Sequence, residues 1–167
     1  NEAKISIIPV GIKEIIKEKM NKVSFLKKYS IENPYILFVG TLQPRKNVER
    51  LIEAFSKLKN TDIDLVLVDK KGWQYENILK APEKFGVSSR VDFLHNVSNE
   101  DLPLFYENAV CFVLLSLYEG FGLPVLEAMK YGCPVATSDV SSLPEAGGDA
   151  AVYFDPEDVD SISAKLA

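Results

Sequence analysis

The chain has 167 residues, of which 47% are apolar and 26% charged, a balance typical of one globular domain with a sizeable core. Its net charge of −5 argues against a nucleic-acid-binding protein, so an anionic ligand would need a local group of cations. No apolar run approaches the roughly 20 residues of a membrane-spanning helix. The N-terminus also lacks the basic and apolar regions of a signal peptide.

The first 34 residues run from a short apolar segment through the basic stretch KEIIKEKMNKVSFLKKYS to Pro34. This stretch is amphipathic and could suggest contact with a membrane surface. It also carries Glu14 and Glu18, which favours an ordinary surface helix. We therefore expect residues 1–34 to be a connector that leads into a single domain over residues 35–167.

Short apolar runs then alternate with segments of helical periodicity. The runs YILFV, LVLV and VCFVLL are nearly continuous in apolar residues, which is typical of strands buried on both faces. The expected strands, including one in the connector, are residues 5–9, 35–39, 65–68, 91–94, 110–115, 134–137 and 151–154.

Four helices are expected between these strands and a fifth after the last of them. The first follows Asn47, a plausible N-cap, and the next two cover residues 74–85 and 99–108. Ser98 or Asn99 could cap the third helix, with Pro103 in its first turn. A fourth helix runs from about residue 123 to 131, and the last begins near residues 156–158.

This alternation predicts an α/β fold, a Rossmann-like doubly wound parallel sheet with helices on both faces. In such sheets ligands bind beyond the carboxyl ends of the strands. The loops that follow Val39, Val68, Leu94, Leu115 and Thr137 are therefore the places to look for chemistry.

The two cysteines, Cys111 and Cys133, each lie in an apolar, strand-like run. We expect buried free thiols in a reducing cytoplasm, with a disulfide or a metal pair as a remote alternative.

The loop after Val39 contains two adjacent cations, Arg45 and Lys46, immediately before a predicted helix. Positive charge at that end of a helix is mildly unfavourable for the helix, but the helix N-terminus and two cations together suit a diphosphate. The alternative is a solvated basic turn. Gly40, which we expect to give the strand a tight exit, is the only glycine there, so neither a dinucleotide-binding loop nor a P-loop fits.

The loop after Leu115 reads SLYEGFGLPVLEAMK and contains Glu119 and Glu127. Glu119 lies where the strand ends, and Glu127 lies one turn into the next helix. Because helical side chains lean toward the N-terminus, both carboxylates should face one crevice and could accept bonds from sugar hydroxyls. The alternatives are an exposed loop acid for Glu119 and helix-dipole compensation for Glu127.

Two further loops are less informative. His95, the only histidine, could act as a base, but a surface loop histidine is the simpler interpretation. Asp69, Lys70 and Lys71 end another strand and could line the rim of a site. No His/Cys cluster of the kind that binds metals is present in the sequence.

Three segments together resemble the C-terminal domain of the family four glycosyltransferases, GT-B enzymes with two Rossmann-like halves. They are FVGTLQPRKNVERLIEAF, VDFLHNVSNEDLPLFYENA and SLYEGFGLPVLEAMKYGCPVATSDVSSLPEAGGDAAVYFDPED. The most specific element is the E-x7-E spacing from Glu119 to Glu127. The segment IIPVGI also matches the entry into this half, so the resemblance covers nearly the whole chain.

The resemblance implies retaining transfer of a sugar from a nucleotide diphosphate sugar, without a metal or other cofactor, in polysaccharide or glycolipid synthesis. Arg45 and Lys46 would stabilise the leaving diphosphate, Glu119 would contact the donor sugar, and Glu127 the ribose. The catalytic residues would be Glu119, Arg45 and Lys46. The implied donor site comprises Gly40, Thr41, Arg45, Lys46, Leu94, His95, Asn96, Val97, Glu119, Gly120, Phe121, Gly122, Leu123 and Glu127.

The sequence departs from the family pattern at three positions. Thr41 stands where many relatives have arginine, Asp69 where many have glycine, and His95 where a small residue is common. The resemblance also implies a missing N-terminal half that carries the acceptor site. This chain alone should then bind donor weakly and transfer nothing.

By its resemblance to the family, the segment GTLQPRKN favours a donor of the GDP-mannose type. The alternatives are half of a GT-B nucleotide-sugar epimerase or a non-catalytic nucleotide-binding module. We expect a cytoplasmic protein without nucleic-acid partners, and contact with the inner face of a membrane only through the missing half.

Overall fold

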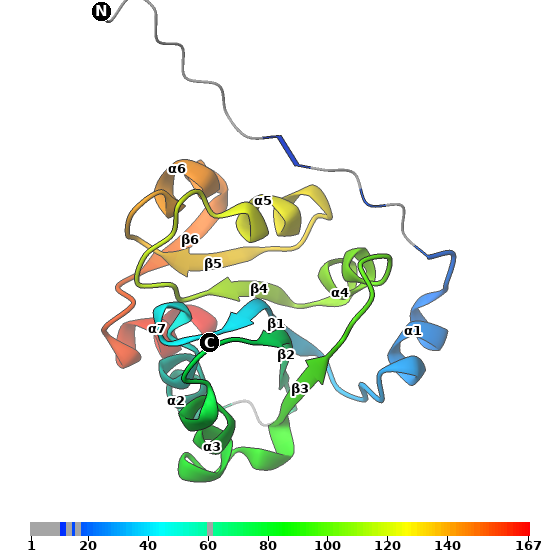
Figure 1. Ribbon diagram of the computed structural model, residues 1–167, viewed down its shortest axis with the longest axis horizontal. Coiled ribbons are helices and arrows are strands. Elements are labelled where there is room, and N and C mark those ends of the chain that lie inside the picture. The colour runs from blue at the N-terminus through cyan, green and yellow to red at the C-terminus, as the bar shows by residue number, and fades with distance from the viewer. Residues whose placement is uncertain (1–10, 13–14, 16–17, 60–61) are drawn as a thin grey trace, which may run out of the picture.

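The computed structural model describes residues 11–12, 15, 18–59 and 62–167, so the strand predicted at residues 5–9 lies outside the described residues. Six strands form one parallel sheet in the order β3-β2-β1-β4-β5-β6 (Figure 1). They are β1 (Tyr35–Leu42), β2 (Asp64–Lys71), β3 (Val91–His95), β4 (Cys111–Leu114), β5 (Val135–Ser138) and β6 (Ala151–Phe154). The predicted doubly wound fold is confirmed.

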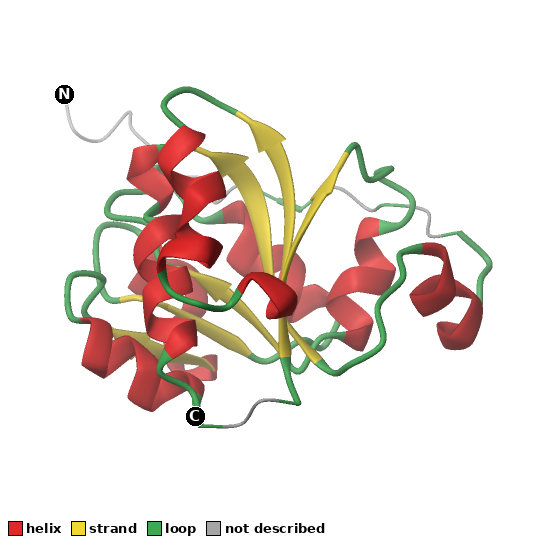
Figure 2. Cartoon of the chain, turned by 90° about the horizontal axis from the view of Figure 1, so that it is seen from below, coloured by secondary structure: helices red, strands yellow, loops and turns green. Residues whose placement is uncertain are grey.

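Helices cover both faces of the sheet, which Figure 2 shows as a twisted layer between them. The helices α2 (Val48–Ser56), α3 (Glu76–Lys84) and α7 (Val159–Leu166) lie together on one face. The other face carries α1 (Lys22–Lys28), α4 (Leu102–Asn108) and α5 (Leu123–Lys130), with the short α6 (Leu143–Gly147) beside α5. Three 3-10 turns, η2 (Pro44–Lys46), η3 (Ser88–Arg90) and η4 (Gly148–Ala150), complete the described helices.

The order of the strands reverses between β1 and β4, which are neighbours in the sheet. From β1 the chain crosses through α2 to β2 on one side, and from β4 it crosses through α5 to β5 on the other. The loops that leave β1 and β4 therefore diverge and leave a crevice beyond the carboxyl ends of the strands. Arg45 and Lys46 lie in the first of these loops, and Glu119 lies in the second.

β1 and β2 extend further than the sequence pattern predicts. Their pairing continues from Gly40 opposite Asp69 to Leu42 opposite Lys71. The expectation that Gly40 forms a tight exit from the strand is therefore wrong. A Cβ atom there would lie 3.1 Å from the Phe38 ring, closer than Cβ atoms usually approach, so the glycine leaves room for that ring.

The expected helix caps differ in two places. Asn47 occupies the N-cap of α2 as expected, but it lies in the left-handed region at φ 57° and its side chain makes no capping bond. Its amide instead donates to the Pro156 carbonyl at 2.8 Å. The N-cap of α4 is Asp101, not Ser98 or Asn99. By contrast, α5 ends close to residue 131 as expected, with Tyr131 as its C-cap and Gly132 following at φ 71°.

Both cysteines are free, and Cys133 is buried. Burial raises the pKa of the Cys133 thiol to about 11, so it is a protonated, apolar part of the core at neutral pH. The expectation of free thiols is confirmed, and that of burial holds for Cys133, whereas Cys111 is only partly buried.

The N-terminal helix α1 packs on α4 through an aromatic cluster and a buried carboxylate. Phe25 is fully buried, and its ring meets the Phe105 ring edge-on with centroids 4.8 Å apart. Asp101, which is 1% exposed, accepts hydrogen bonds from Lys28 Nζ at 2.8 Å and from the Tyr29 hydroxyl. Part of the segment expected to be a connector thus contributes to the core.

The Asp101 contacts give a prediction for acid stability. Burial alone raises the pKa of this carboxyl, but hydrogen bonds from Lys28, Tyr29 and Ser98 outweigh it and lower the pKa to about 2. A carboxyl whose pKa is depressed by folding stabilises the fold above its unfolded value, and this contribution is lost as the pH falls from about 4 toward 2.

We expect Asp101→Asn to lower the free energy of unfolding by about 1.5–3 kcal/mol at pH 6. The difference from the wild type should narrow below pH 4, which urea titrations at pH 6, 4 and 3 would measure. A difference that is constant with pH would contradict the assignment.

Candidate functional site

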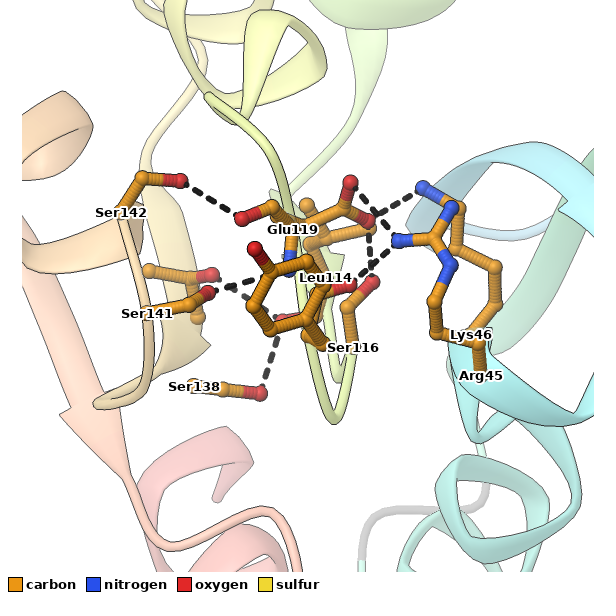
Figure 3. Close-up of polar contacts among 10 residues, drawn as sticks. Arg45, Lys46, Leu114, Ser116, Glu119, Ser138, Ser141 and Ser142 are labelled. Carbon is orange, nitrogen blue, oxygen red and sulfur yellow. Dashed lines mark hydrogen bonds and ion pairs between the residues drawn. The ribbon is translucent and has the colours of Figure 1, made fainter.

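The carboxylate of Glu119 lies at the centre of a polar cluster between the loops that follow β1 and β4 (Figure 3). Arg45 Nη1 is 3.1 Å from Glu119 Oε2, and Lys46 Nζ forms an ion pair with Oε1. The Ser116 hydroxyl donates a hydrogen bond to the same Oε1 at 2.6 Å. The structure thus brings all three predicted catalytic residues into direct contact.

Hydrogen bonds to main-chain carbonyls hold these two loops together. The Leu117 N–H donates to the Arg45 carbonyl at 2.9 Å, and the Arg45 guanidinium donates to the Tyr118 carbonyl. The turn η2, which begins at Pro44, therefore lies directly against the loop before α5. The position of both cations is set by contacts between segments about 70 residues apart.

Two serines in the loop after β5 hold the Glu119 backbone. The Glu119 N–H donates to Ser141 Oγ at 3.0 Å, and the Ser142 hydroxyl donates to the Glu119 carbonyl at 3.1 Å (Figure 3). With Ser116, these are residues that the sequence analysis missed. The signal that could have found the two loop serines is the loop after Thr137, which follows a strand end and begins with polar residues.

Burial and charge act in opposite directions on Glu119. The residue is 8% exposed and Lys46 is 7% exposed. Burial raises the pKa of the carboxyl, but hydrogen bonds from Lys46 and Ser116 outweigh it, so the net pKa is lowered and the group is ionised at neutral pH. The cluster is thus a mostly buried anion neutralised by two cations.

Glu127 has a different partner. Its Oε2 accepts a hydrogen bond at 3.1 Å from the hydroxyl of Tyr106, a residue of α4 that is 1% exposed. Burial raises the pKa of Glu127, and the bond from Tyr106 only partly offsets this. Tyr106 was also missed, because a tyrosine in an amphipathic helix carries no signal that distinguishes it from a core residue.

The loop between the two glutamates ends at a helix start that requires glycine. Gly122 is the N-cap of α5 at φ 91°, and a Cβ there would lie 2.9 Å from Leu143. No side chain caps the helix. Gly120, Phe121 and Leu123 therefore lie around an uncapped helix N-terminus beside Glu119.

A separate pocket of about 180 Å³ lies at the carboxyl ends of β1, β2 and β3. It contains four of the residues predicted for the donor site, together with two predicted to line its rim. These are Gly40, Thr41, Asn96 and Val97, with Asp69 and Lys70.

The remaining two candidates lie in β3, beside this pocket. Leu94 is half-buried there, and His95 Nδ1 lies 2.8 Å from Oδ1 of the fully buried Asp69 side chain. His95 is thus an exposed histidine that contacts a buried carboxylate of the neighbouring strand β2.

In the described part of the chain, no three His, Cys, Asp or Glu side chains form a group suited to holding a metal ion. Among the same residues, no helix combines the length and apolar character needed to cross a membrane.

Comparisons with known proteins identify the family of the chain. The family model described as "Glycosyl transferases group 1" matches residues 13–167. The chain belongs to this family. The resemblance to GT-B glycosyltransferases is thereby confirmed.

Among individual proteins, the chain is 42% identical over 145 residues to the O-antigen chain mannosyltransferase B of Escherichia coli. The match covers 84% of this chain but 38% of that protein, so the chain spans well under half of this relative.

Two solved structures share the fold at lower identity. The crystal structure of WaaG, a glycosyltransferase involved in lipopolysaccharide biosynthesis, matches 96% of this chain and 46% of its own, with 24% identity and a TM-score of 0.82. The structure of Anabaena HepE in complex with UDP and glucose matches 89% of this chain and 42% of its own, with 20% identity and a TM-score of 0.76.

Proposed function

We propose that this chain is the donor-binding half of a retaining glycosyltransferase that uses a nucleotide diphosphate sugar. The observation that carries the proposal is the pair of cations, Arg45 and Lys46, held against Glu119 at the point where the strand order reverses. This is where doubly wound sheets bind nucleotides. Family membership supports the same assignment.

In this proposal the two cations bind the diphosphate and stabilise the charge that develops on the leaving group. Glu119 contacts the donor sugar, and Glu127 accepts bonds from the ribose hydroxyls. N–H groups of Phe121, Gly122 and Leu123 at the start of α5 bind phosphate or sugar oxygens. No metal or cofactor is proposed, because Arg45 and Lys46 supply the positive charge.

The nucleotide base is proposed to occupy the pocket of about 180 Å³ at the ends of β1 to β3, flanked by residues 94–97. The name of the Escherichia coli relative favours a mannose donor in surface polysaccharide synthesis. The resemblance of the segment GTLQPRKN favours GDP as the nucleotide. Residues 35–167 would form the donor domain, entered through residues 1–34. The acceptor site and any membrane contact would belong to a further, N-terminal half of a cytoplasmic enzyme, so this chain alone would transfer no sugar.

Calorimetric titration of the chain with GDP, UDP and ADP tests the proposal. We expect at least one of them to bind, with GDP the tightest. Binding of none of the three would overturn the proposed donor site. Neither a nucleotide-sugar epimerase nor a non-catalytic module is favoured by any observation on the site.

Tyr106→Phe gives a prediction specific to the ribose. The hydroxyl of Tyr106 orients the Glu127 carboxylate, so its loss should weaken GDP binding by about 0.5–1.5 kcal/mol, the value of one hydrogen bond. The measurement is GDP affinity compared with that of 2′,3′-dideoxy-GDP. The dideoxy nucleotide should bind the variant and the wild type equally, and an equal loss for both nucleotides would show that Tyr106 has only a structural role.

A further inference from the structure

Glu119 forms ion pairs with the two cations that the proposed function assigns to the diphosphate. Its two carboxylate oxygens are divided between them, Oε2 with Arg45 at 3.1 Å and Oε1 with Lys46. A diphosphate can bind these cations at full strength only if they leave Glu119. The ion pairs therefore compete with the ligand.

We propose that Glu119 is an internal competitor that makes the site prefer a nucleotide diphosphate sugar over the bare nucleotide diphosphate. This inference rests on the proposed function and adds a selectivity that the donor-binding assignment does not contain. The proposal has two bases. Glu119 is less mobile than the side chains of the two cations, and a nucleotide diphosphate sugar offers the carboxylate hydrogen-bond donors that a bare nucleotide diphosphate does not.

The mobility differs because three serines hold Glu119 at its carboxylate and its main chain, whereas Arg45 and Lys46 reach it at the ends of long side chains. Ser116 holds the carboxylate, while Ser141 and Ser142 hold the main chain on either side. The Arg45 side chain is 38% exposed, and a long, flexible aliphatic stem carries its guanidinium group. When a diphosphate binds, the cations move toward it and Glu119 stays in place.

The hydrogen-bond donors available to Glu119 differ between the two ligands, because the sugar supplies hydroxyl groups beside the carboxylate and a bare diphosphate supplies none. Once the cations shift, Glu119 is a largely buried carboxylate that retains Ser116 as a donor but has lost its charge partners. Such a group is strongly destabilising unless new donors replace the lost ones. Sugar hydroxyls beside Glu119 replace them, whereas GDP leaves the carboxylate underbonded and facing phosphate charge. Donor should therefore bind tighter than product, which favours product release.

The test compares GDP with GDP-mannose by calorimetry, on the wild-type chain and on Glu119→Gln. Glutamine has nearly the same shape but no charge, so it no longer competes. We expect the variant to bind GDP about tenfold tighter, the equivalent of 1.4 kcal/mol. The ratio of the GDP dissociation constant to that of GDP-mannose should fall toward one.

Two further variants complete the design. Glu145→Gln removes the same charge from an exposed side chain in α6 and should leave both affinities within about twofold, as a surface change does. Glu119→Asp keeps the charge but withdraws the carboxylate by one methylene group. It should tighten GDP binding to a smaller extent, and it serves as the test if Glu119→Gln does not fold.

The outcomes separate this inference from the proposed function. A wild-type chain that binds neither GDP nor GDP-mannose would overturn both. A wild-type chain that binds GDP, with Glu119→Gln folded by circular dichroism and binding GDP no tighter, would overturn the inference alone. Equal tightening in Glu145→Gln would attribute the effect to overall charge and would also overturn it.

Discussion

Lys46→Met is expected to lower the free energy of unfolding by about 3 kcal/mol, because it leaves the buried Glu119 carboxylate without its closest charge partner. The value lies at the lower end for a broken buried ion pair because Arg45 stays in contact with Glu119. The same variant should lose detectable binding of nucleotide diphosphates. Urea denaturation and calorimetric titration are the two measurements.

The double variant Lys46→Met with Glu119→Gln separates the two effects. Neutralising the orphaned carboxylate should recover most of the lost stability, while nucleotide binding stays weak because one cation is still missing. Lys57→Met is the matched control, since Lys57 pairs with Asp160 at the surface, with side chains 44% and 85% exposed. Exposed pairs contribute about 0–1 kcal/mol, so a control as destabilised as Lys46→Met would contradict the argument.

Phe25→Ala is expected to lower the free energy of unfolding by about 3–5 kcal/mol, the cost of removing a buried aromatic ring and leaving a cavity. The ring contacts Phe105 of α4 at 4.8 Å and Tyr29 at 5.4 Å between centroids, so its loss affects the packing between two helices. Urea denaturation at neutral pH, monitored by circular dichroism, measures the change.

The control for this variant lies in the same helix. Val23, which is 77% exposed, should tolerate alanine within about 0.5 kcal/mol. The pair of variants also tests where the domain begins. A small effect of Phe25→Ala would support a connector that ends at residue 34, whereas a large effect would assign α1 to the folded domain.

The sequence predicted the fold well because its strong signals are local. Continuous apolar runs identified β1, β2 and β4, and helical spacing of apolar residues identified α2 and α5. The sequence predicted the ends of the strands less well. β1 and β2 run on through Gly40 and Asp69 because each strand supplies the other with hydrogen-bonding partners, and such pairing between distant segments leaves no local pattern.

For the candidate site, too, the sequence predicted local features but not the contacts between distant segments. The sequence indicated Arg45, Lys46 and Glu119 as chemically unusual residues near strand ends, but it predicted no contact between the cations and the acid. In the structure they are bonded to it. The sequence predicted that Glu119 and Glu127 face one crevice, but it gave no sign that Glu127 accepts a hydrogen bond from Tyr106 of a different helix. No spacing in the sequence predicts the contacts of Glu119 with the cations or of Glu127 with Tyr106, since these contacts join separate loops and helices.

The sequence by itself determined which residue types stand at the strand ends, and hence the class of fold and the chemistry available to a ligand. Apolar periodicity and the position of glycine, proline and charge are sufficient for that, because they act within a few residues. Only the tertiary structure decided which charges neutralise each other. Ion pairing depends on distances of a few ångströms between loops about 70 residues apart, and those distances are set by how β1 and β4 pair in the sheet.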